Sequence, residues 1–496
     1  MTSSLPAPIR GSAPRWDARQ WGLLLVLCGA VCLDALDVSM VGMALPSIRT
    51  DLHMSTSSLQ WIVSGYVLGY GGLLLLGGRA ADLLGRRRVL IAALAAFAVA
   101  SLLGGLVNDG SLLIATRFVK GLAAAFTAPA ALSTLTTTFR EGPERNRAVA
   151  IYTTSGASGF SLGLILGGLL TEAGWRWTFL APAPVALLVF AGARALLPRD
   201  VAVDRPRGGY DIIGAVTATA AMLLLVYAVV RAPQVGWGSV ATIAQLVGVV
   251  VLAAAFLVAE TRSRNPLVRL GILRSGSLAR ANLGALTVFG AYVGFQFVGT
   301  LYFQSLLGWS SLRTAFGFLP AGLIVAFTAP HVGKLADRFG TARIIVVGAS
   351  SFLAGYLLSL RIGTTSHYFS VVLPTMVLIG IGFALCFPAL NIQATAGVKN
   401  EEQGLASGLL NTGFQVGGAV VLAIVTAVAS TGTTAPAGVV HAFRLGLSVV
   451  AGVAALGLVV AVYGALVERR HVAETEPQAD VVPAPTEIEP VGAAAE

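Results

Sequence analysis

The 496-residue chain is 56% hydrophobic and only 11% charged, with a mean hydropathy of +0.81 and a net charge of +10. Soluble globular domains carry about 25% charged residues, so this composition excludes an ordinary soluble protein. The positive charge does not indicate a nucleic-acid partner, because the basic residues lie in short loops between apolar runs. That placement is typical of the cytoplasmic loops of a membrane protein.

Fourteen apolar runs are each long enough to cross a bilayer, which takes about 20 helical residues. Because backbone polar groups must be paired inside lipid, the sequence predicts an all-α polytopic membrane protein. The predicted spans are 21–43, 60–78, 89–107, 111–134, 148–170, 177–197, 212–230, 239–258, 281–304, 314–331, 342–360, 370–392, 405–429 and 444–466.

The distribution of basic residues predicts the orientation. Of the 33 lysines and arginines, 25 fall in segments on the same side as the N-terminus and six in segments on the other side. Cytoplasmic loops carry the excess of positive charge, so both termini are expected to be cytoplasmic. We expect a multi-pass protein of a prokaryotic plasma membrane. The two remaining basic residues, Arg117 and Lys120, lie within the fourth span.

The first span carries two carboxylates, Asp34 and Asp37, three residues apart and so on one helical face. Each charge costs about 2.5–3.5 kcal/mol at mid-membrane, which makes sense only on a face lining a wet cavity. They are the carboxylates that we place well inside a span, and burial can tune such a group to exchange protons. This pattern predicts a transporter; a carboxylate that caps backbone groups or pairs permanently with Arg117 is the structural alternative.

Other classes of function find no support. Cys28 and Cys32 lie one turn apart without a nearby histidine, so packing is favoured over a metal site and no metal is expected. The sequence has no G-x-x-x-x-G-K-[ST] loop, and no soluble segment is long enough to hydrolyse ATP. We expect neither an enzyme nor an ATP-driven pump, and no cofactor. A membrane sensor is disfavoured by the two acids.

An internal repeat predicts the domain organisation. GGRAADLLGRRRVL (77–90) and VGKLADRFGTARII (332–345) align without gaps, each after the second span of a six-span block. Duplicated halves with a central site are typical of transporters. We expect a cytoplasmic segment at 1–20, six-helix bundles at 21–197 and 281–466, a linker with two extra helices at 198–280, and a disordered cytoplasmic tail at 467–496.

The 77–90 loop resembles the signature loop of the major facilitator superfamily, G-x-x-x-D-R-x-G-R-R, although Leu83 stands where that family has arginine. We expect Asp82 to cap a helix N-terminus or pair with an arginine and so latch the inner gate. A solvated basic turn is the alternative. The predicted gating residues are Gly78, Asp82, Gly85, Arg86, Arg87 and Arg88, with Gly333, Asp337, Arg338 and Gly340 in the second copy.

Further motifs resemble the fourteen-span drug:proton antiporters of that superfamily. LDVSMVGMALP (36–46) is similar to their first-helix pattern and places Asp37 on its aspartate. ATRFVKGLAAAFTAPA (115–130) is similar to R-F-x-Q-G, with Arg117 on the arginine and Lys120 in place of glutamine. The resemblance implies that Asp37 takes the proton, with a role for Arg117 in proton transfer and Asp34 as a relay or cation anchor. An arginine that snorkels to the interface is the alternative.

The fifth span resembles the antiporter motif G-x-x-x-G-P-x-x-G-G. Its glycines fall on Gly159, Gly163, Gly167 and Gly168, and Leu164 takes the proline position. Small residues at this spacing let two helices approach closely, which suits an interface that must rock. Packing alone would explain them equally well.

Substrate contacts are expected on spans that line the central cavity in this superfamily. Polar groups in apolar helices are candidates for hydrogen bonds to a substrate, and aromatic residues suit a lipophilic one. Packing between helices is an equal alternative for each. The candidates are Trp61, Tyr66, Tyr292, Gln296, Asn411 and Gln415.

Taken together, the resemblance implies a major facilitator fold with fourteen helices arranged as six, two and six. It implies a proton-coupled exporter of lipophilic or cationic drugs or antibiotics that works by alternating access. The alternative is a transporter of one specific metabolite or natural product, on which the fold is silent. The expected partners are a small molecule, protons and lipid, and the protein is expected to be monomeric.

Overall fold

The computed structural model describes residues 16–140, 143–199, 211–263, 271–272, 275–365, 368–398, 403–429 and 436–475. Every regular element in these ranges is helical. The longer helices are α1 (Ala18–Asp51), α2 (Thr56–Leu84), α3 (Arg86–Leu106), α4 (Gly110–Thr138), α5 (Pro143–Ala173), α7 (Pro182–Leu196), α8 (Ile212–Val235), α9 (Val240–Arg262), α10 (Gly276–Leu301), α11 (Ser311–Thr328), α13 (Thr341–Ser359), α14 (Leu373–Thr395), α15 (Gln403–Ala429) and α16 (Pro436–Thr475). The shorter ones are α6 (Trp177–Leu180), α12 (Val332–Phe339) and the turns η2 (Tyr302–Leu306), η3 (Ala329–His331) and η4 (Tyr368–Val372).

A helix covers each of the fourteen predicted spans. Among the described residues, thirteen helices are long and apolar enough to cross a membrane. The predicted span 60–78 lies in α2, which is not among the thirteen and contains several residues whose side chains are not described. The all-α membrane fold is therefore confirmed, whereas the count of fourteen membrane spans stays a prediction.

Acidic residues at the ends of spans cap the helices. The Asp109 carboxylate accepts from the backbone N–H of Leu112 at 2.9 Å, and that of Asp211 accepts from Gly214 at 2.7 Å. Both bonds satisfy N–H groups that the first turn of a helix leaves without partners. These carboxylates therefore serve local structure, which leaves Asp34 and Asp37 as the acids within the apolar part of α1.

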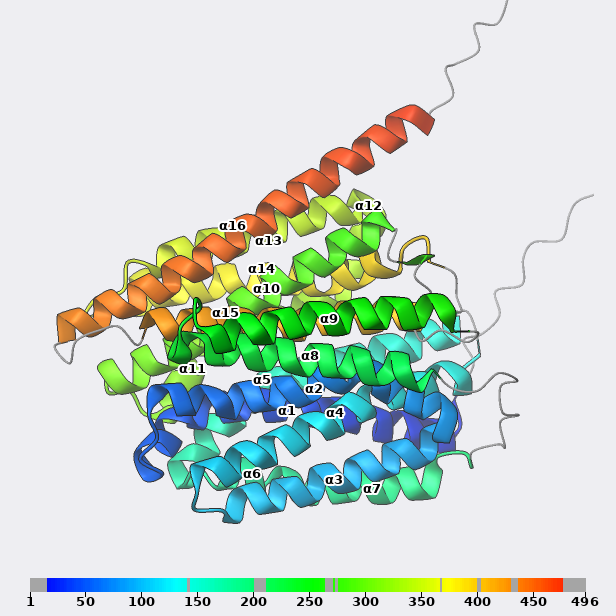
Figure 1. Ribbon diagram of the computed structural model, residues 1–496, viewed down its shortest axis with the longest axis horizontal. Helices are drawn as coiled ribbons and strands as arrows, with labels where there is room; N and C mark the ends of the chain where they lie inside the picture. Colours follow the sequence, from blue (N-terminus) through cyan, green and yellow to red (C-terminus); the bar gives the residue numbers. More distant parts are fainter. Residues whose placement is uncertain are drawn as a thin grey trace, which may run out of the picture.

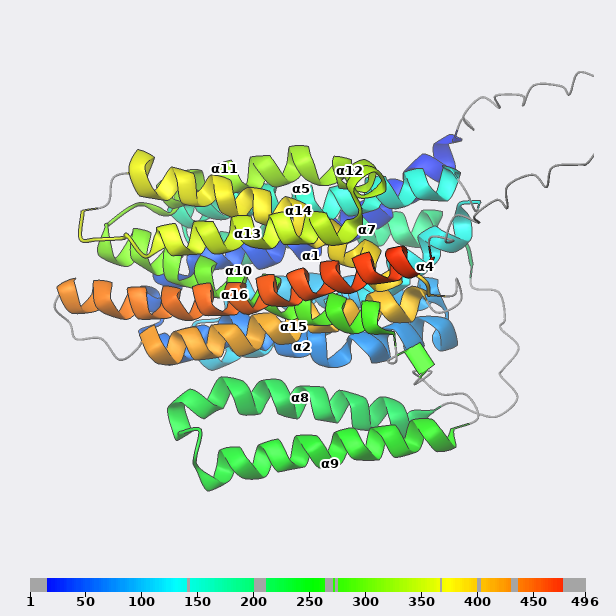
Figure 2. The same cartoon turned by 90° about the horizontal axis from the view of Figure 1, so that it is seen from above.

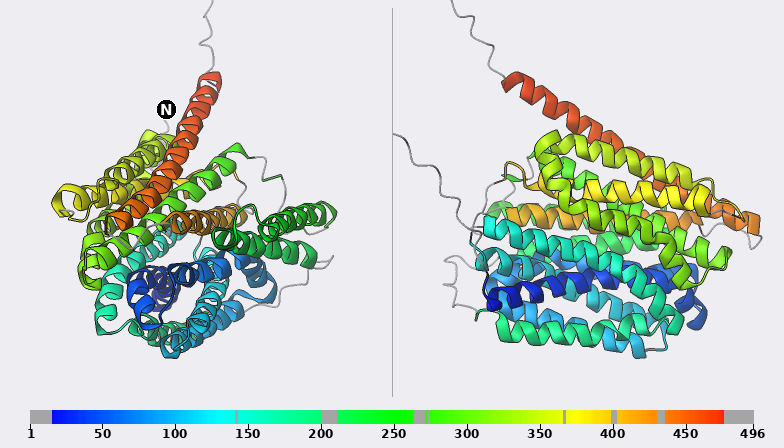
Figure 3. Two further views of the ribbon diagram at one scale, coloured as in Figure 1. Left: turned by 60° about the vertical axis from the view of Figure 1, so that its left-hand side comes forward. Right: turned by 180° about the vertical axis from the view of Figure 1, so that it is seen from behind.

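The long helices run side by side along one direction (Figure 1). In the N-terminal part, α1 packs against α5 and α7, α2 against α4, and α3 against α4 and α7. In the C-terminal part, α10 packs against α15 and α16, and α13 against α14 and α16. Contacts of α5 with α11 and of α2 with α15 join the two parts, which lie next to each other in the oblique view (Figure 3, left).

The hairpin of α8 and α9 lies at one side of the other helices (Figure 2). Of the two, α8 contacts both α2 and α15. Trp61 of α2 lies 5.9 Å from Tyr227 of α8, measured between ring centroids, and Leu223 of α8 packs against Gly72. The side chains of α9 are mostly exposed, as expected for a helix that faces lipid.

The two repeated loops fold alike. Gly85 separates α2 from α3 with φ 97° and ψ 131°, and Gly340 separates α12 from α13 with φ 83° and ψ 142°. Only glycine adopts this region readily, because a Cβ atom would clash with the backbone. Each loop is thus a one-residue reversal that requires glycine, which explains why the glycine recurs in both copies.

The C-terminal segment differs from its prediction. Helix α16 continues to Thr475, so the first nine residues of the segment expected to be disordered, 467–475, are helical. The rest of that segment, 476–496, and the first 15 residues of the chain lie outside the described residues. The division into two six-helix bundles and a two-helix linker stays a prediction.

Replacing Gly340 tests the reversal between α12 and α13. We expect Gly340→Ala to lower the free energy of unfolding by about 1–3 kcal/mol, the cost of a residue held in a sparsely populated region. Gly333→Ala is the control, since Gly333 is helical and an added Cβ would meet nothing within 4 Å. Thermal unfolding in detergent compares the two, and equal stability of both variants would contradict the assignment.

Candidate functional site

Asp37 lies at the centre of a buried charge cluster between α1 and α4. One carboxylate oxygen accepts a hydrogen bond from Nη1 of Arg117 and the other from Nζ of Lys120. Asp37 and Lys120 have no exposed surface, and Arg117 is 2% exposed. Because Arg117 and Lys120 are three residues apart on α4, both side chains reach the same face of α1.

Neighbouring helices hold the two cations in place. Arg117 donates from Nε to the carbonyl oxygen of Ile62 on α2 at 3.1 Å, and its guanidinium lies 4.5 Å from the ring centre of Tyr66. The ammonium group of Lys120 lies 4.6 Å from the ring centre of Phe97 on α3. Cation–π contacts of this kind stabilise charges that have been removed from water.

Asp34 lies one turn before Asp37 and has a different environment. Its side chain is buried, with 8% exposed, and its Oδ2 atom has no hydrogen-bond partner in the described part of the chain. It interacts electrostatically with Asp37 and Lys120. A buried carboxylate oxygen without a partner is costly in its charged form. Of the two aspartates, Asp34 is therefore the one whose surroundings leave room for a proton.

The cluster contains two acids and two bases, which balance when all four are ionised. A proton on Asp34 would leave one net positive charge in a low-dielectric region. That charge would repel a cationic ligand. It would also destabilise a packing of the helices around the cluster that requires the cluster to be neutral. The cluster can thus convert protonation into an electrostatic change inside the membrane.

Sequence reasoning found Asp34, Asp37 and Arg117 but did not count Lys120 as a site residue. The signal that pointed to Lys120 was its position three residues after Arg117 in an apolar span, which places both side chains on one helical face. The alternative that Arg117 snorkels to an interface is wrong, because its guanidinium is buried against Asp37. Whether the cluster moves protons stays a prediction.

The glycines of α5 pack against the helix that carries both aspartates. An added Cβ on Gly159 would lie 2.6 Å from the carbonyl oxygen of Cys32, one on Gly163 2.6 Å from that of Leu36, and one on Gly167 2.7 Å from Cα of Met40. Gly168 instead faces α11, where an added Cβ would lie 2.9 Å from the carbonyl oxygen of Ser311. The stripe lets α5 approach both α1 and α11 closely.

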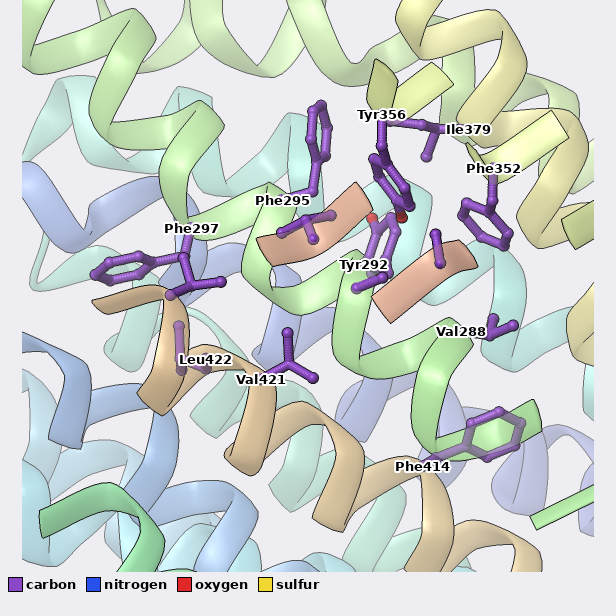
Figure 4. Close-up of a cluster of buried hydrophobic side chains, with 14 of the residues drawn as sticks. Val288, Tyr292, Phe295, Phe297, Phe352, Tyr356, Ile379, Phe414, Val421 and Leu422 are labelled. Carbon is purple, nitrogen blue, oxygen red and sulfur yellow. The ribbon is translucent and has the colours of Figure 1, made fainter. Parts of the chain in front are cut away.

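Tyr292 belongs to an aromatic cluster made of Phe160, Phe289, Tyr292, Phe383, Phe387 and Phe414. Its ring centre lies 5.7 Å from that of Phe160 on α5 and 4.9 Å from that of Phe383 on α14. Figure 4 shows the Tyr292 hydroxyl pointing toward that of Tyr356. The cluster thus joins α5 to the C-terminal helices. Of these six residues, only Tyr292 was predicted from the sequence, because phenylalanines are common in apolar spans and carry no signal of their own.

The remaining substrate candidates do not form one group. Gln296 is 9% exposed, faces Gly42 of α1, and its amide nitrogen has no partner among the described residues. Asn411 donates to the carbonyl oxygen of Ser407 at 2.9 Å, whereas Gln415 is buried against Gly71 of α2.

Tyr66 and Trp61 lie in two other places. Tyr66 packs against Arg117 in the charge cluster. Trp61 packs against Tyr227 of α8 in a small apolar cluster, apart from the other candidates.

The predicted gating loops are only partly described. Arg86 donates to Oγ1 of Thr137 at 2.8 Å, and Arg87 donates to the carbonyl oxygen of Arg194 at 2.6 Å. These bonds tie the start of α3 to the ends of α4 and α7.

The latch of the inner gate expected of Asp82 is not tested by the described residues. The side chain of Asp82 lies outside the described residues, and Asp337, Arg338 and Gly340 are exposed. A latch at Asp82 therefore stays a prediction.

At the other end of the helices, hydrogen bonds join the two parts of the chain. Nε2 of Gln304 donates to the carbonyl oxygen of Met43 at 3.0 Å, and the Glu172 carboxylate accepts from the backbone N–H of Leu312 at 3.1 Å. Nearer the middle of α5, Ser161 donates to the carbonyl oxygen of Gly322 on α11 at 3.1 Å. An open cleft of about 840 Å³ lies over Gln304 and Glu172.

Comparison with known proteins identifies the family. The sequence profile of the Major Facilitator Superfamily matches residues 27–422. The chain belongs to this superfamily. As a major facilitator protein it is a multi-pass membrane transporter of small molecules rather than an enzyme, and it needs no cofactor. The family resemblance stated from the motifs is thereby confirmed.

Two relatives match nearly the whole transporter. The puromycin resistance protein pur8 of Streptomyces alboniger is 37% identical over 490 residues, which cover 94% of this chain and 95% of the relative. The cephamycin export protein CmcT of Amycolatopsis lactamdurans is 37% identical over 439 residues, covering 88% and 90%. The crystal structure of a point mutant of the nucleoside transporter NupG has a TM-score of 0.64 at 11% identity, covering 90% of this chain and 99% of that chain. This last likeness shows the fold alone.

Removing the charge of Asp37 tests the cluster. We expect Asp37→Asn to lose about 3–5 kcal/mol of stability, because two buried cations are left without their anion. Asp37→Asn combined with Lys120→Gln should recover part of the loss. Asp51→Asn is the control, since Asp51 and Arg176 are exposed and such pairs contribute about 0–1 kcal/mol. Thermal unfolding in detergent measures all three; equal losses for Asp37→Asn and Asp51→Asn would contradict the prediction.

A larger side chain at Gly163 tests the contact of α5 with α1. Gly163→Ala should cost about 1–3 kcal/mol, since its Cβ would press on the Leu36 backbone. Gly452→Ala on α16 should cause no loss, because nothing lies within 4 Å of its added Cβ. Melting temperatures of the purified variants provide the measurement, and an unchanged value for Gly163→Ala would refute close packing at this point.

Proposed function

We propose that this major facilitator protein is a proton-coupled exporter of amphiphilic organic compounds such as antibiotics. The observation that carries the proposal is the buried carboxylate of Asp34, whose Oδ2 atom has no hydrogen-bond partner among the described residues, beside Asp37, whose two oxygens both have one. A secondary transporter needs a group inside the membrane that gains and loses a proton during its cycle, and intramembrane acids are the usual choice.

The geometry supports a division of labour between the two aspartates. Each oxygen of Asp37 already accepts a hydrogen bond from a cation, which favours its ionised form. We therefore assign proton uptake to Asp34, and we assign to Asp37, Arg117 and Lys120 the role of sensing it. This differs from the expectation that Asp37, the residue with the family match, takes the proton itself.

Alternating access would follow from the contacts between the two parts. The hydrogen bonds of Glu172 and Gln304 join the two parts at the end of the helices that the charge distribution predicts to be outside, and that of Ser161 joins them near the middle of α5. Protonation of Asp34 from that side would require these bonds to open, while the glycines of α5 keep α1 and α5 together. The six-two-six organisation, the cytoplasmic termini, the plasma membrane location and the monomeric state belong to this proposal.

The aromatic cluster supports a lipophilic substrate. Rings from α5, α10, α14 and α15 meet at the junction of the two parts, and Gln296 adds an amide nitrogen without a hydrogen-bond partner among the described residues. Apolar walls with a few polar points are typical of sites for small organic molecules. The two relatives are named for resistance to puromycin and export of cephamycin, which supports an antibiotic-like compound.

A narrow exporter of one natural product is the second candidate. Both relatives are named after a single antibiotic, which favours a restricted range over a broad one. Uptake of several unrelated dyes into inside-out vesicles would support the broad exporter. Saturable uptake of one compound, without competition from the dyes, would support the narrow one.

Transport driven by an imposed pH gradient tests proton coupling. Puromycin and a panel of cationic dyes are offered to inside-out vesicles with an acidic interior. With one proton per substrate, one pH unit supports about tenfold accumulation. We expect Asp34→Asn to equilibrate the substrate without accumulating it, and Asp51→Asn to match the wild type. Accumulation by Asp34→Asn would contradict the assignment, and no gradient-driven uptake by the wild type would contradict the function.

A further inference from the structure

A groove between α1 and α5 lies on the opposite side of these helices from the charge and aromatic clusters. It has a volume of about 580 Å³, and its lining includes Leu25 and Cys32 of α1 and Arg147, Ile151, Thr154 and Ser158 of α5. No step of the proposed transport cycle uses it.

Helical geometry shows that the groove faces lipid. On α1, Leu25 is nine residues from Asp34, which places the two on opposite faces. On α5, Ile151 is likewise nine residues from Phe160, which points inward to Tyr292. Leu25 is 65% exposed, and α1 contacts both α5 and α7, which flank it at the surface seen from behind (Figure 3, right).

The lining is unusual for a surface that faces acyl chains. Leu25 and Ile151 are apolar, but Thr154, Ser158 and Cys32 place hydroxyl and thiol groups among them. Lipid-exposed surfaces of membrane helices are otherwise apolar, so polar side chains there indicate a specific contact. Leu25 and Ile151 lie nearer to Arg147 than Thr154, Ser158 and Cys32 do, so a ligand whose head binds at Arg147 passes the apolar pair first.

Arg147 supplies a positive charge at one end of the groove. Its guanidinium is exposed and lies 4.6 Å from the ring centre of Trp16 and 5.8 Å from that of Trp21. Tryptophans of this kind mark the level of the lipid headgroups. No carboxylate of the described residues forms a salt bridge with Arg147; Glu144, one turn earlier, accepts instead from Gln20 at 3.4 Å.

We propose that this groove binds an anionic phospholipid. The headgroup phosphate binds at Arg147, and one acyl chain runs from there past Leu25 and Ile151 toward Thr154 and Ser158. Basic pockets between helices on the cytoplasmic side are suited to anionic headgroups. The lipid would cover the outer side of the α1–α5 pair, whose inner side carries Asp34 and Asp37.

Lipid retention by the purified full-length protein tests the site. Nanodiscs of phosphatidylcholine with and without phosphatidylglycerol of the same acyl chains are compared, and native mass spectrometry counts the phosphatidylglycerol retained. An arginine near the surface contributes about 1 kcal/mol, so Arg147→Gln should weaken binding about fivefold. Arg343→Gln, an exposed arginine at the start of α13, should retain as much as the wild type.

Two further experiments distinguish lipid binding in the groove from a general attraction of anions to the positive charge of the protein. Ser158→Phe fills the groove without changing the charge, and it should also reduce the amount of phosphatidylglycerol retained. If the lipid only touched Arg147 on an open surface, this variant would retain as much as the wild type. Inorganic phosphate in phosphatidylcholine discs should not raise the melting temperature as phosphatidylglycerol does.

The proposal is overturned if Arg343→Gln loses as much lipid as Arg147→Gln, if Ser158→Phe retains the lipid, or if phosphate alone stabilises the protein equally. No substrate or gradient is used, so the result is independent of the proposed transport.

Discussion

The pairing of one buried carboxylate with two buried cations is the constraint on which the N-terminal helices depend. Asp37 belongs to α1, both cations belong to α4, and Arg117 also binds a carbonyl group of α2. Charges removed from water are tolerated only when their partners are correctly placed. The relative positions of three helices are therefore fixed by a single polar centre in otherwise apolar surroundings.

Close approach of the helix backbones makes this centre possible. An added Cβ on Gly69 of α2 would lie 2.8 Å from the backbone nitrogen of Leu122, and one on Gly121 of α4 would lie 3.0 Å from Cα of Tyr66. On the other side, the glycines of α5 bring that helix against α1. Small residues are the usual means of association in lipid, where burying apolar surface gives little driving force. The charge cluster and the glycine contacts thus depend on each other.

Most of the fold could be predicted because the bilayer imposes a strong rule on sequence. Runs of about 20 apolar residues must be helices, and every predicted span coincides with one. The glycine turns at Gly85 and Gly340 were visible as a repeat. The extent of α16 was not, since the acidic, proline-rich composition of the last residues concealed where the helix ends.

The candidate site was only partly predictable for a different reason. A charged residue in an apolar span stands out, so Asp34, Asp37 and Arg117 were found. Which cation pairs with which oxygen depends on how helices rotate against each other, and Lys120 was missed on that account. Trp61 was assigned to the central cavity by analogy, but its ring contacts Tyr227 of α8, a helix that the sequence predicts to lie outside the repeated six-span blocks.

The position of α8 has a mechanical consequence. Toward α2 it presents Leu223 and Tyr227, which interlock with Gly72 and Trp61, whereas toward α15 it meets the small side chains of Ala419 and Ala423. An interlocked surface resists shear, and a smooth one permits it. If α2 and α15 shift relative to each other, we therefore expect the α8–α9 hairpin to move with α2.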